Sequence, residues 1–162
     1  ISGYPDLTFR PNNQVSRAES AAIVAQTLGL QGPSPDFVTR FTDMGDHWAR
    51  NAVLALEEQG ILGGFEEPDG TYTFRPNLPM TRAQEARILV QAYPVPAPPP
   101  GFQTRFRDIS GHWAEGDIIA LEAAGYITGF EETDGSFTYR PEQSLTRAEL
   151  CTILVRILDL LG

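Results

Sequence analysis

Three arginines stand at equal intervals in the sequence, each at the start of a predicted helix. Arg17, Arg82 and Arg147 follow one another at intervals of 65 residues. Each lies in a four-residue motif in which Ser or Thr stands three positions before Glu or Gln. This motif is the capping box that begins a helix. The three copies are Ser16-Arg17-Ala18-Glu19, Thr81-Arg82-Ala83-Gln84 and Thr146-Arg147-Ala148-Glu149. A cation at a helix N-terminus is unfavourable by about 0.3–1 kcal/mol. The threefold repetition of this unfavourable position indicates either that other interactions offset its cost or that the arginine has a function.

The chemistry that these positions favour is the binding of an anion. The helix dipole, the free amides of the first turn and the guanidinium act in the same sense, and a planar carboxylate or a phosphate suits them best. We therefore predict that each arginine points into a groove near free helix amides. A second interpretation stays open, in which each arginine pairs with a nearby Asp or Glu and only fixes a loop.

The arginines recur because the chain is built from repeats. Each capping box follows a Phe/Tyr-Arg-Pro step and opens an apolar run. We predict complete repeats at 41–94 and 106–162, the second half of another repeat at 1–30, a linker at 31–40 and a Pro-rich linker at 95–105. The helix that would come first in the partial repeat is missing. We therefore expect the surface around Ala21, Ala22 and Ala25 to be exposed, or covered by residues outside this chain.

Each complete repeat is predicted to be a helix, a glycine turn, a short hairpin and a capping-box helix. The first helix is expected to run from its N-cap Asp46 to Gln59. Asp-Gly pairs should turn hairpins at 65–74 and 130–139. Trp48 and Trp113 are interpreted as core wedges, with stacking on a sugar as the alternative. The last capping-box helix should be the most buried of the three, and Cys151 a small buried residue within it.

Composition excludes several classes of function. The formal net charge of −9 argues against nucleic acid as the main partner. No apolar run approaches the roughly 20 residues that span a bilayer. The sequence holds no phosphate loop, no Ser-His-Asp order and no Cys-His pair, so we predict neither a catalytic site nor a cofactor.

Two further sets of residues are interpreted structurally. His47 and His112 lack partners at metal-ligand spacing, so we expect neither a metal nor a catalytic role. Acidic residues of the two hairpins provide oxygen ligands that suit calcium, but they lack the spacing of a dedicated calcium loop. A solvated acidic hairpin is therefore the favoured interpretation for Glu66, Glu67, Asp69, Glu131, Glu132 and Asp134.

His-Trp-Ala, a Gly-rich turn, Phe-Arg-Pro and Thr-Arg-Ala-Glu, in that order, resemble the S-layer homology (SLH) repeat. The resemblance implies a mainly α, pseudo-threefold domain of the cell envelope or cell surface. It implies noncovalent anchoring of a surface or S-layer protein to an envelope glycan, either a secondary cell-wall polymer or a peptidoglycan-linked polysaccharide. It also implies glycan-binding roles for Arg17, Arg82, Arg147, Gly3, Gly64 and Gly129. The competing class is a structural module that packs against its own protein or neighbouring subunits of a surface layer.

The later repeats depart from the family pattern through their acidic hairpins. Gly64 precedes Arg82 by 18 residues, whereas Gly3 precedes Arg17 by only 14. We expect the negative charge of these insertions to lie near Arg82 and Arg147 and to weaken anion binding there. Arg17 is accordingly expected to contribute most.

Overall fold

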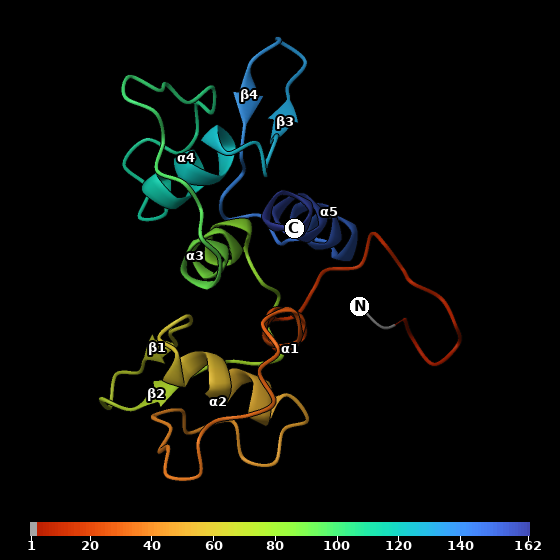
Figure 1. The fold of residues 1–162 in the computed structure, drawn as a ribbon, viewed down its shortest axis with the longest axis vertical. Helices are drawn as coiled ribbons and strands as arrows, with labels where there is room; N and C mark the ends of the chain where they lie inside the picture. Colours follow the sequence, from red (N-terminus) through yellow and green to blue (C-terminus); the bar gives the residue numbers. More distant parts are fainter. Residues whose placement is uncertain (1–2) are drawn as a thin grey trace. The chain divides into compact units, whose positions relative to one another are not determined.

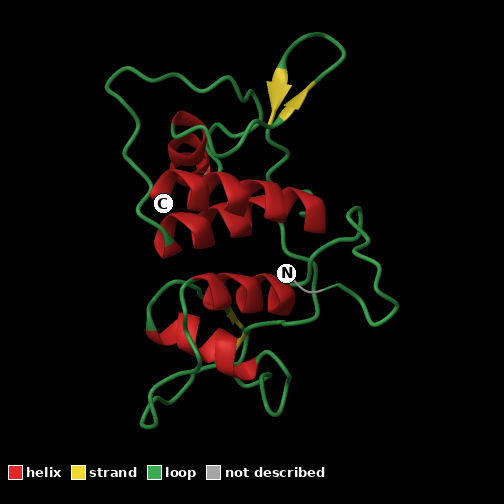
Figure 2. Ribbon diagram, turned by 45° about the vertical axis from the view of Figure 1, so that its right-hand side comes forward, coloured by secondary structure: helices red, strands yellow, loops and turns green. Residues whose placement is uncertain are grey.

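A computed structural model describes residues 3–162; Ile1 and Ser2, which belong to the predicted partial repeat, lie outside the described residues. The described residues form short helices and two small hairpins joined by long loops, so the predicted mainly α class is confirmed (Figures 1 and 2). The helices are α1 (Arg17–Thr27), α2 (Arg50–Glu58), α3 (Arg82–Ala92), α4 (Glu115–Ala123) and α5 (Arg147–Leu161). The strands are β1 (Phe65–Glu66), β2 (Tyr72–Thr73), β3 (Phe130–Glu131) and β4 (Phe137–Thr138).

The three capping boxes begin α1, α3 and α5 at the predicted arginines. Thr81 and Thr146 each accept a hydrogen bond from the amide three residues later, and the side-chain oxygen of that later residue accepts from the cap amide. Ser16 Oγ accepts from the Glu19 amide at 3.1 Å. The side-chain oxygens thus bind amides that have no partner inside the helix.

The first helix of each complete repeat begins later than predicted. The N-cap of α2 is Ala49 and no side chain of the described residues caps it, so the prediction of Asp46 as the cap is wrong. Instead His47 Nδ1 accepts from the Ala49 amide at 3.1 Å and forms the turn before the helix. Trp48 lies in this turn rather than on the helix, and 66% of it is exposed. The core-wedge interpretation is therefore wrong for Trp48 and for Trp113, which is 54% exposed; sugar stacking stays a prediction.

Both predicted hairpins form. β1 pairs antiparallel with β2, and β3 with β4. The turns hold Gly70 and Gly135 at φ of 82° and 81°, a left-handed conformation that glycine adopts without steric cost. Phe74 and Tyr139 follow the second strands and are almost completely buried, so the hairpins are held by the core.

The elements divide into two compact units. The α1 unit is Val15–Pro79, and in it α2 packs against α1 beside the first hairpin (Figure 1). The α3–α5 unit consists of residues up to Gln14 and Met80–Gly162, and in it α4 packs against α3. Within each unit, therefore, a capping-box helix joins the first helix and hairpin of the next repeat. The pseudo-threefold arrangement and the repeat boundaries stay predictions.

Three burial predictions are wrong, for one physical reason. Ala21 and Ala25, expected to be uncovered, are at most 1% exposed because α2 packs against α1. The uncovered apolar face is instead on α5, which was expected to be the most buried helix, and Val155 there is 56% exposed. Cys151 on the same helix is only partly buried.

Hydrogen bonds stabilise the ionised form of one glutamate in each hairpin. Glu67 Oε1 accepts from Thr73 Oγ1 at 2.5 Å and from Arg75 Nη2 at 3.0 Å. These bonds lower the pKa of Glu67 below its ordinary value of 4.5, the hydroxyl having the larger effect. The same arrangement lowers the pKa of Glu132, which accepts from Thr138 and Arg140.

Acid should therefore destabilise the chain through these two carboxylates. Each of these carboxylates has a folded-state pKa below its unfolded value. Its contribution to the stability of the fold is therefore present above pH 4.5 and is lost as the pH falls through the folded-state pKa. We expect the double variant Glu67→Gln, Glu132→Gln to lose less thermal stability than the wild type between about pH 6 and about pH 3. Glu66→Gln, Glu131→Gln is the matched control, and equal losses in all three proteins would contradict the prediction.

Candidate functional site

The three repeated arginines form three matching buried clusters. Arg17 and Arg82 are each 4% exposed and Arg147 is 6% exposed. In each cluster the Nε atom donates to the backbone carbonyl that precedes the arginine of a Phe/Tyr-Arg-Pro step. The acceptors are Phe74 for Arg17 at 2.8 Å, Tyr139 for Arg82 at 2.8 Å and Phe9 for Arg147 at 3.0 Å.

Each of these guanidinium groups also lies over two aromatic rings. Arg82 is 4.6 Å from the ring centroids of both Phe130 and Tyr139, and Arg140 lies 4.0 Å from that of Phe130. The α1 unit repeats this cluster with Arg17 and Arg75 at Phe65, and Arg147 and Arg10 repeat it at Tyr4. Cation–π attraction is strongest when the pair is desolvated, so the contact favours burial of the charge. The chain has twelve arginines and no lysine, which suits this stacking.

The amides at the start of these helices are not free, and that part of the prediction is wrong. The Arg82 and Ala83 amides donate to the carbonyls of Gln143 and Pro141, each at 2.9 Å, and Thr81 accepts from the third amide. The amides of Arg17 and Ala18, and of Arg147 and Ala148, are bound in the same way. The loop after each Phe/Tyr-Arg-Pro step crosses a helix start, and its carbonyls supply the negative partial charge that the helix terminus favours.

The partner of each arginine also differs from the sequence expectation. Arg17 lies against the 65–74 hairpin and Arg82 against the 130–139 hairpin, because each arginine packs on the turn of the following repeat. Arg147 lies against Tyr4 and Phe9, in the short turn that lacks an acidic insertion. Arg17 was expected to contribute most to anion binding because its turn lacks an acidic insertion, and this reason applies to Arg147 instead. The prediction that an acidic insertion lies near Arg147 is wrong.

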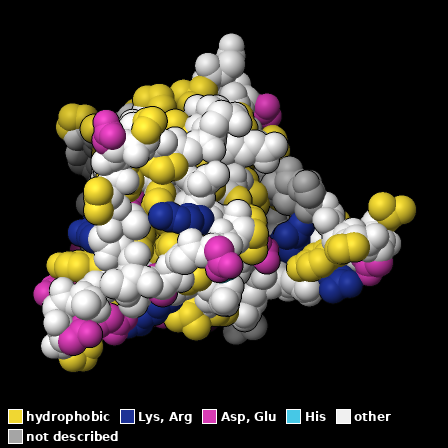
Figure 3. Space-filling view, turned by 90° about the horizontal axis from the view of Figure 1, so that it is seen from below, with side chains coloured by type: hydrophobic (Ala, Val, Ile, Leu, Met, Phe, Trp, Pro, Cys, Tyr) yellow, Lys and Arg dark blue, Asp and Glu magenta, His cyan; other side chains and the backbone are white. Residues whose placement is uncertain are grey.

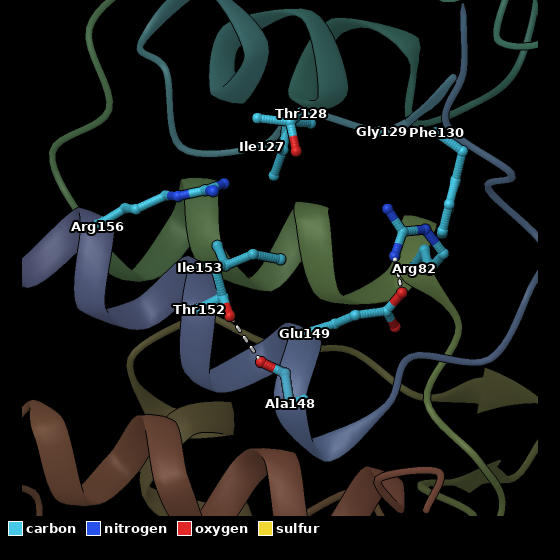
Figure 4. Close-up of a pocket in the computed structure, with 10 residues that line it drawn as sticks. All are labelled: Arg82, Ile127, Thr128, Gly129, Phe130, Ala148, Glu149, Thr152, Ile153 and Arg156. Atoms are coloured by element: carbon cyan, nitrogen blue, oxygen red, sulfur yellow. Dashed lines mark hydrogen bonds and ion pairs between the residues drawn. The ribbon is translucent and has the colours of Figure 1, made fainter. Parts of the chain in front are cut away.

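The α3–α5 unit holds a pocket of about 270 Å³ at the Arg82 cluster. Arg82 lies at one end and pairs with Glu149 Oε1 at 2.9 Å, while Arg156 reaches in from α5 at the other end (Figure 4). The turn that contains Gly129 closes one side of the pocket (Figure 4). Two guanidinium groups and one carboxylate among the lining residues leave a formal charge of +1. The full lining is Arg82, Ile127, Thr128, Gly129, Phe130, Ala148, Glu149, Thr152, Ile153 and Arg156.

Arg156 is the pocket residue that sequence reasoning missed. It is partly exposed, and its Nη1 donates to the Tyr126 carbonyl at 3.2 Å. The signal that would have found it is a break in the repeat: the positions 65 and 130 residues earlier are Gln91 and Gln26. A search for residues that recur at the 65-residue interval finds Arg82 but misses Arg156, because an arginine occurs at this position only in the last repeat.

The turn glycines are required by close packing of the backbone. A Cβ at Gly129 would lie 2.5 Å from the Thr138 carbonyl oxygen, and one at Gly3 would lie 2.8 Å from that of Thr8. A Cβ at Gly64 would overlap the Thr73 carbonyl and the Phe41 ring. Gly129 lines the pocket, whereas a ligand contact at any of the three glycines stays a prediction.

On the face that Figure 3 draws, the basic side chains do not form a continuous surface. Figure 3 shows arginines as separate patches among acidic and hydrophobic side chains. This pattern suits a local anion site in an acidic protein better than a long polyanion track.

The other side chains considered for chemistry are bound within the fold. His47 Nε2 lies 3.1 Å from Asn77 Oδ1, and His112 Nε2 lies 2.6 Å from Glu142 Oε1. Asp69 Oδ1 accepts from Thr71 Oγ1 at 2.7 Å. Among residues 3–162, no group of three or more His, Cys, Asp or Glu side chains is placed to hold a metal. None of the described helices has the length and apolar character needed to cross a membrane.

Comparison with known proteins identifies the family. The profile of the S-layer homology domain matches residues 1–21, 40–85 and 105–151, more than half of the chain. The chain belongs to the S-layer homology family, and the family and its relatives place it at the cell envelope.

The relatives are much longer proteins. The chain is 36% identical over 165 residues to the cellulosome-anchoring protein of Acetivibrio thermocellus, covering 98% of the chain and 35% of that relative. It is 32% identical to an S-layer protein of Bacillus licheniformis, covering 92% of the chain and 16% of the relative. It is 35% identical to an uncharacterized cell wall amidase of Bacillus anthracis, covering 92% of the chain and 26% of that relative. The chain therefore spans about a third or less of these relatives.

Proposed function

We propose that this chain is a non-catalytic module that anchors a surface protein to an acidic envelope glycan. The observation that carries the proposal is the pocket of the α3–α5 unit, where Arg82 and Arg156 flank a space of about 270 Å³. A space of this size accommodates a sugar unit rather than a whole chain. The family supports the anchoring role, and two relatives carry names that refer to anchoring or to an S-layer.

The two arginines have different roles in this proposal. Arg82 is held by the Tyr139 carbonyl and paired with Glu149, so the uncompensated positive charge of the pocket is that of Arg156. Arg156 is more exposed and gives one hydrogen bond to a carbonyl, which leaves further N–H groups for a ligand carboxylate. A glycan acid group would thus bind Arg156 first and lie near Arg82.

The competing function is a structural one, favoured by the burial of Arg17, Arg82 and Arg147. A module whose arginines only fix loops would pack against its own protein or against neighbouring subunits. Such a module would not bind purified sacculi. The two functions are therefore separated by one binding assay.

Arg156→Ala is the sharpest test of the pocket. A hydrogen bond to a charged group contributes about 1.5–3 kcal/mol, so the variant should bind sacculi about ten- to a hundredfold more weakly. The thermal midpoint should change little, because Arg156 is partly exposed. The assay is co-sedimentation with sacculi of the source organism, with and without the acidic polymer.

The matched control is Arg107→Ala, which removes an exposed arginine outside the pocket. Arg107 pairs with Asp134 at the surface, and both side chains are more than half exposed. The control should bind like the wild type. Unchanged binding by Arg156→Ala would eliminate the pocket as the glycan site, and failure of the wild type to bind would favour the structural role.

A further inference from the structure

The turn before α2 presents an exposed tryptophan ring in a fixed position. Trp48 is 66% exposed and lies two residues before the helix begins. The ring of His47 is 5.5 Å from it between centroids and supports one side of it. His47 is itself held at both nitrogens, because Nδ1 accepts from the Ala49 amide and Nε2 lies 3.1 Å from Asn77 Oδ1. The Trp48 ring is therefore positioned before any ligand arrives.

The matching tryptophan of the last repeat is already occupied by a side chain. The Arg87 guanidinium lies over the Trp113 ring at 5.3 Å from its centroid, and Arg87 Nη2 donates to the Trp113 carbonyl at 3.3 Å. The ion pair with Asp117 holds this guanidinium in place. The position in α1 that matches Arg87 at the repeat interval is Ala22, which has no group to lay over Trp48. Of the two tryptophans, Trp48 is the one whose ring is free to stack on a ligand.

The charged side chains on either side of Trp48 in the sequence are also free. Asp46 lies in the same turn and is exposed, and Arg50 is the first residue of α2 and is partly exposed. Within the described part of the chain, neither side chain forms an ion pair or a hydrogen bond. The matching positions in the last repeat are Gly111 and Glu115, and Glu115 accepts from the Gly111 amide at 3.0 Å. The polar groups of that turn thus bind each other, whereas those beside Trp48 are available.

An exposed ring between a free carboxylate and a free guanidinium suits an uncharged sugar. A pyranose has a face of C–H bonds that packs on an aromatic ring and a rim of hydroxyl groups that both donate and accept. Asp46 can accept from a hydroxyl group, and Arg50 and the indole N–H can donate to one. Because the two formal charges cancel, an acid group gains little here, in contrast to the pocket at Arg156. A hydrophobic protein partner would bury both charges without partners, which is costly.

We propose that Trp48 is a stacking site for an uncharged sugar residue and that Trp113 is not. This inference rests on the proposed function, since the sugar would belong to the same envelope glycan. The two sites then recognise different groups of that glycan. The pocket at Arg156 binds an acid group, and Trp48 binds a neutral ring.

Single-tryptophan variants test the site directly, because the chain has two tryptophans. Trp113→Phe retains the indole of Trp48, and Trp48→Phe retains that of Trp113. The probe is envelope polymer released from sacculi of the source organism, with its carboxyl groups reduced to alcohols. We expect this uncharged polymer to change the fluorescence emission of Trp113→Phe and to leave that of Trp48→Phe unchanged. Adding Arg156→Ala to Trp113→Phe should leave the emission change intact, which separates this site from the pocket.

Affinity for the unmodified polymer gives a second readout. Trp48→Ala should bind about three- to tenfold more weakly than the wild type, the range expected for the loss of one aromatic contact. Trp113→Ala is the matched control and should bind like the wild type, because Arg87 already lies over that ring. The thermal midpoint should change little in Trp48→Ala, since two thirds of the side chain is exposed.

The outcomes distinguish this inference from the proposed function. Weaker sacculus binding by Arg156→Ala, with no emission change at Trp48, would overturn the stacking site and leave the pocket in place. Failure of the wild type to bind sacculi would overturn both. Equal emission changes in the two single-tryptophan variants would overturn the assignment to Trp48. So would a wild-type dimer that Trp48→Ala converts to a monomer, because the ring would then contact a second copy of the chain.

Discussion

Replacing Arg82 by alanine is expected to lower the free energy of unfolding by about 1.5–3 kcal/mol, the contribution of a hydrogen bond to a charged group, because Glu149 is 26% exposed and keeps part of its hydration. The Arg82 side chain is only 5% exposed and pairs with Glu149 at 2.9 Å. Its Nε also donates to the Tyr139 carbonyl, which would lose this donor while remaining inside the fold. The aromatic contacts with Phe130 and Tyr139 would disappear as well. Chemical denaturation, followed by circular dichroism, measures the change.

The matched control lies one turn and a half along the same helix. Arg87 pairs with Asp117 at the surface, where an ion pair contributes about 0–1 kcal/mol. Arg87→Ala should therefore change stability little. If Arg82→Ala were no more destabilised than Arg87→Ala, the buried cluster would not hold the loop. A loss of glycan binding by Arg82→Ala must accordingly be judged against its stability, whereas the binding of Arg156→Ala reports on the pocket directly.

Gly64→Ala is expected to lower the free energy of unfolding by about 3 kcal/mol, at the upper end of the range for overpacking. The added methyl would overlap both the Thr73 carbonyl oxygen and the ring of Phe41. Thr73 belongs to β2 and Phe41 is buried, so neither neighbour can move without disturbing the hairpin or the core. Thermal and chemical denaturation of the purified variant give the change.

Gly63→Ala provides the control for the preceding residue. A Cβ there would meet only Arg40 Nη2 at 3.6 Å, an ordinary contact with a flexible side chain. This variant should remain close to the wild type in stability. Equal stability of the two variants would show that the turn tolerates a side chain at Gly64, and the conserved spacing of glycine within the chain would then need another reason, such as ligand contact.

The sequence by itself determined the class of fold and the starts of the three capping-box helices. Capping boxes act through side chains three residues apart, and Asp-Gly turns act over four residues, so local reading places α3 at Arg82 and a hairpin at 65–74. The order of the motifs likewise identified the family. These features depend on interactions within a few residues of each other, which is why no tertiary knowledge was needed.

Only the tertiary structure decided what the arginines contact and where the pocket lies. Arg82 and its acceptor Tyr139 are 57 residues apart, because the arginine of one repeat packs against the hairpin of the next. The helix amides that were expected to be free bind carbonyls from the loop of another repeat for the same reason. Arg156 entered the site although it breaks the repeat, since a pocket is formed by neighbours in space. The exposed face of α5 was likewise hidden from sequence reasoning, because the helix that covers a capping-box helix comes from the following repeat in the chain.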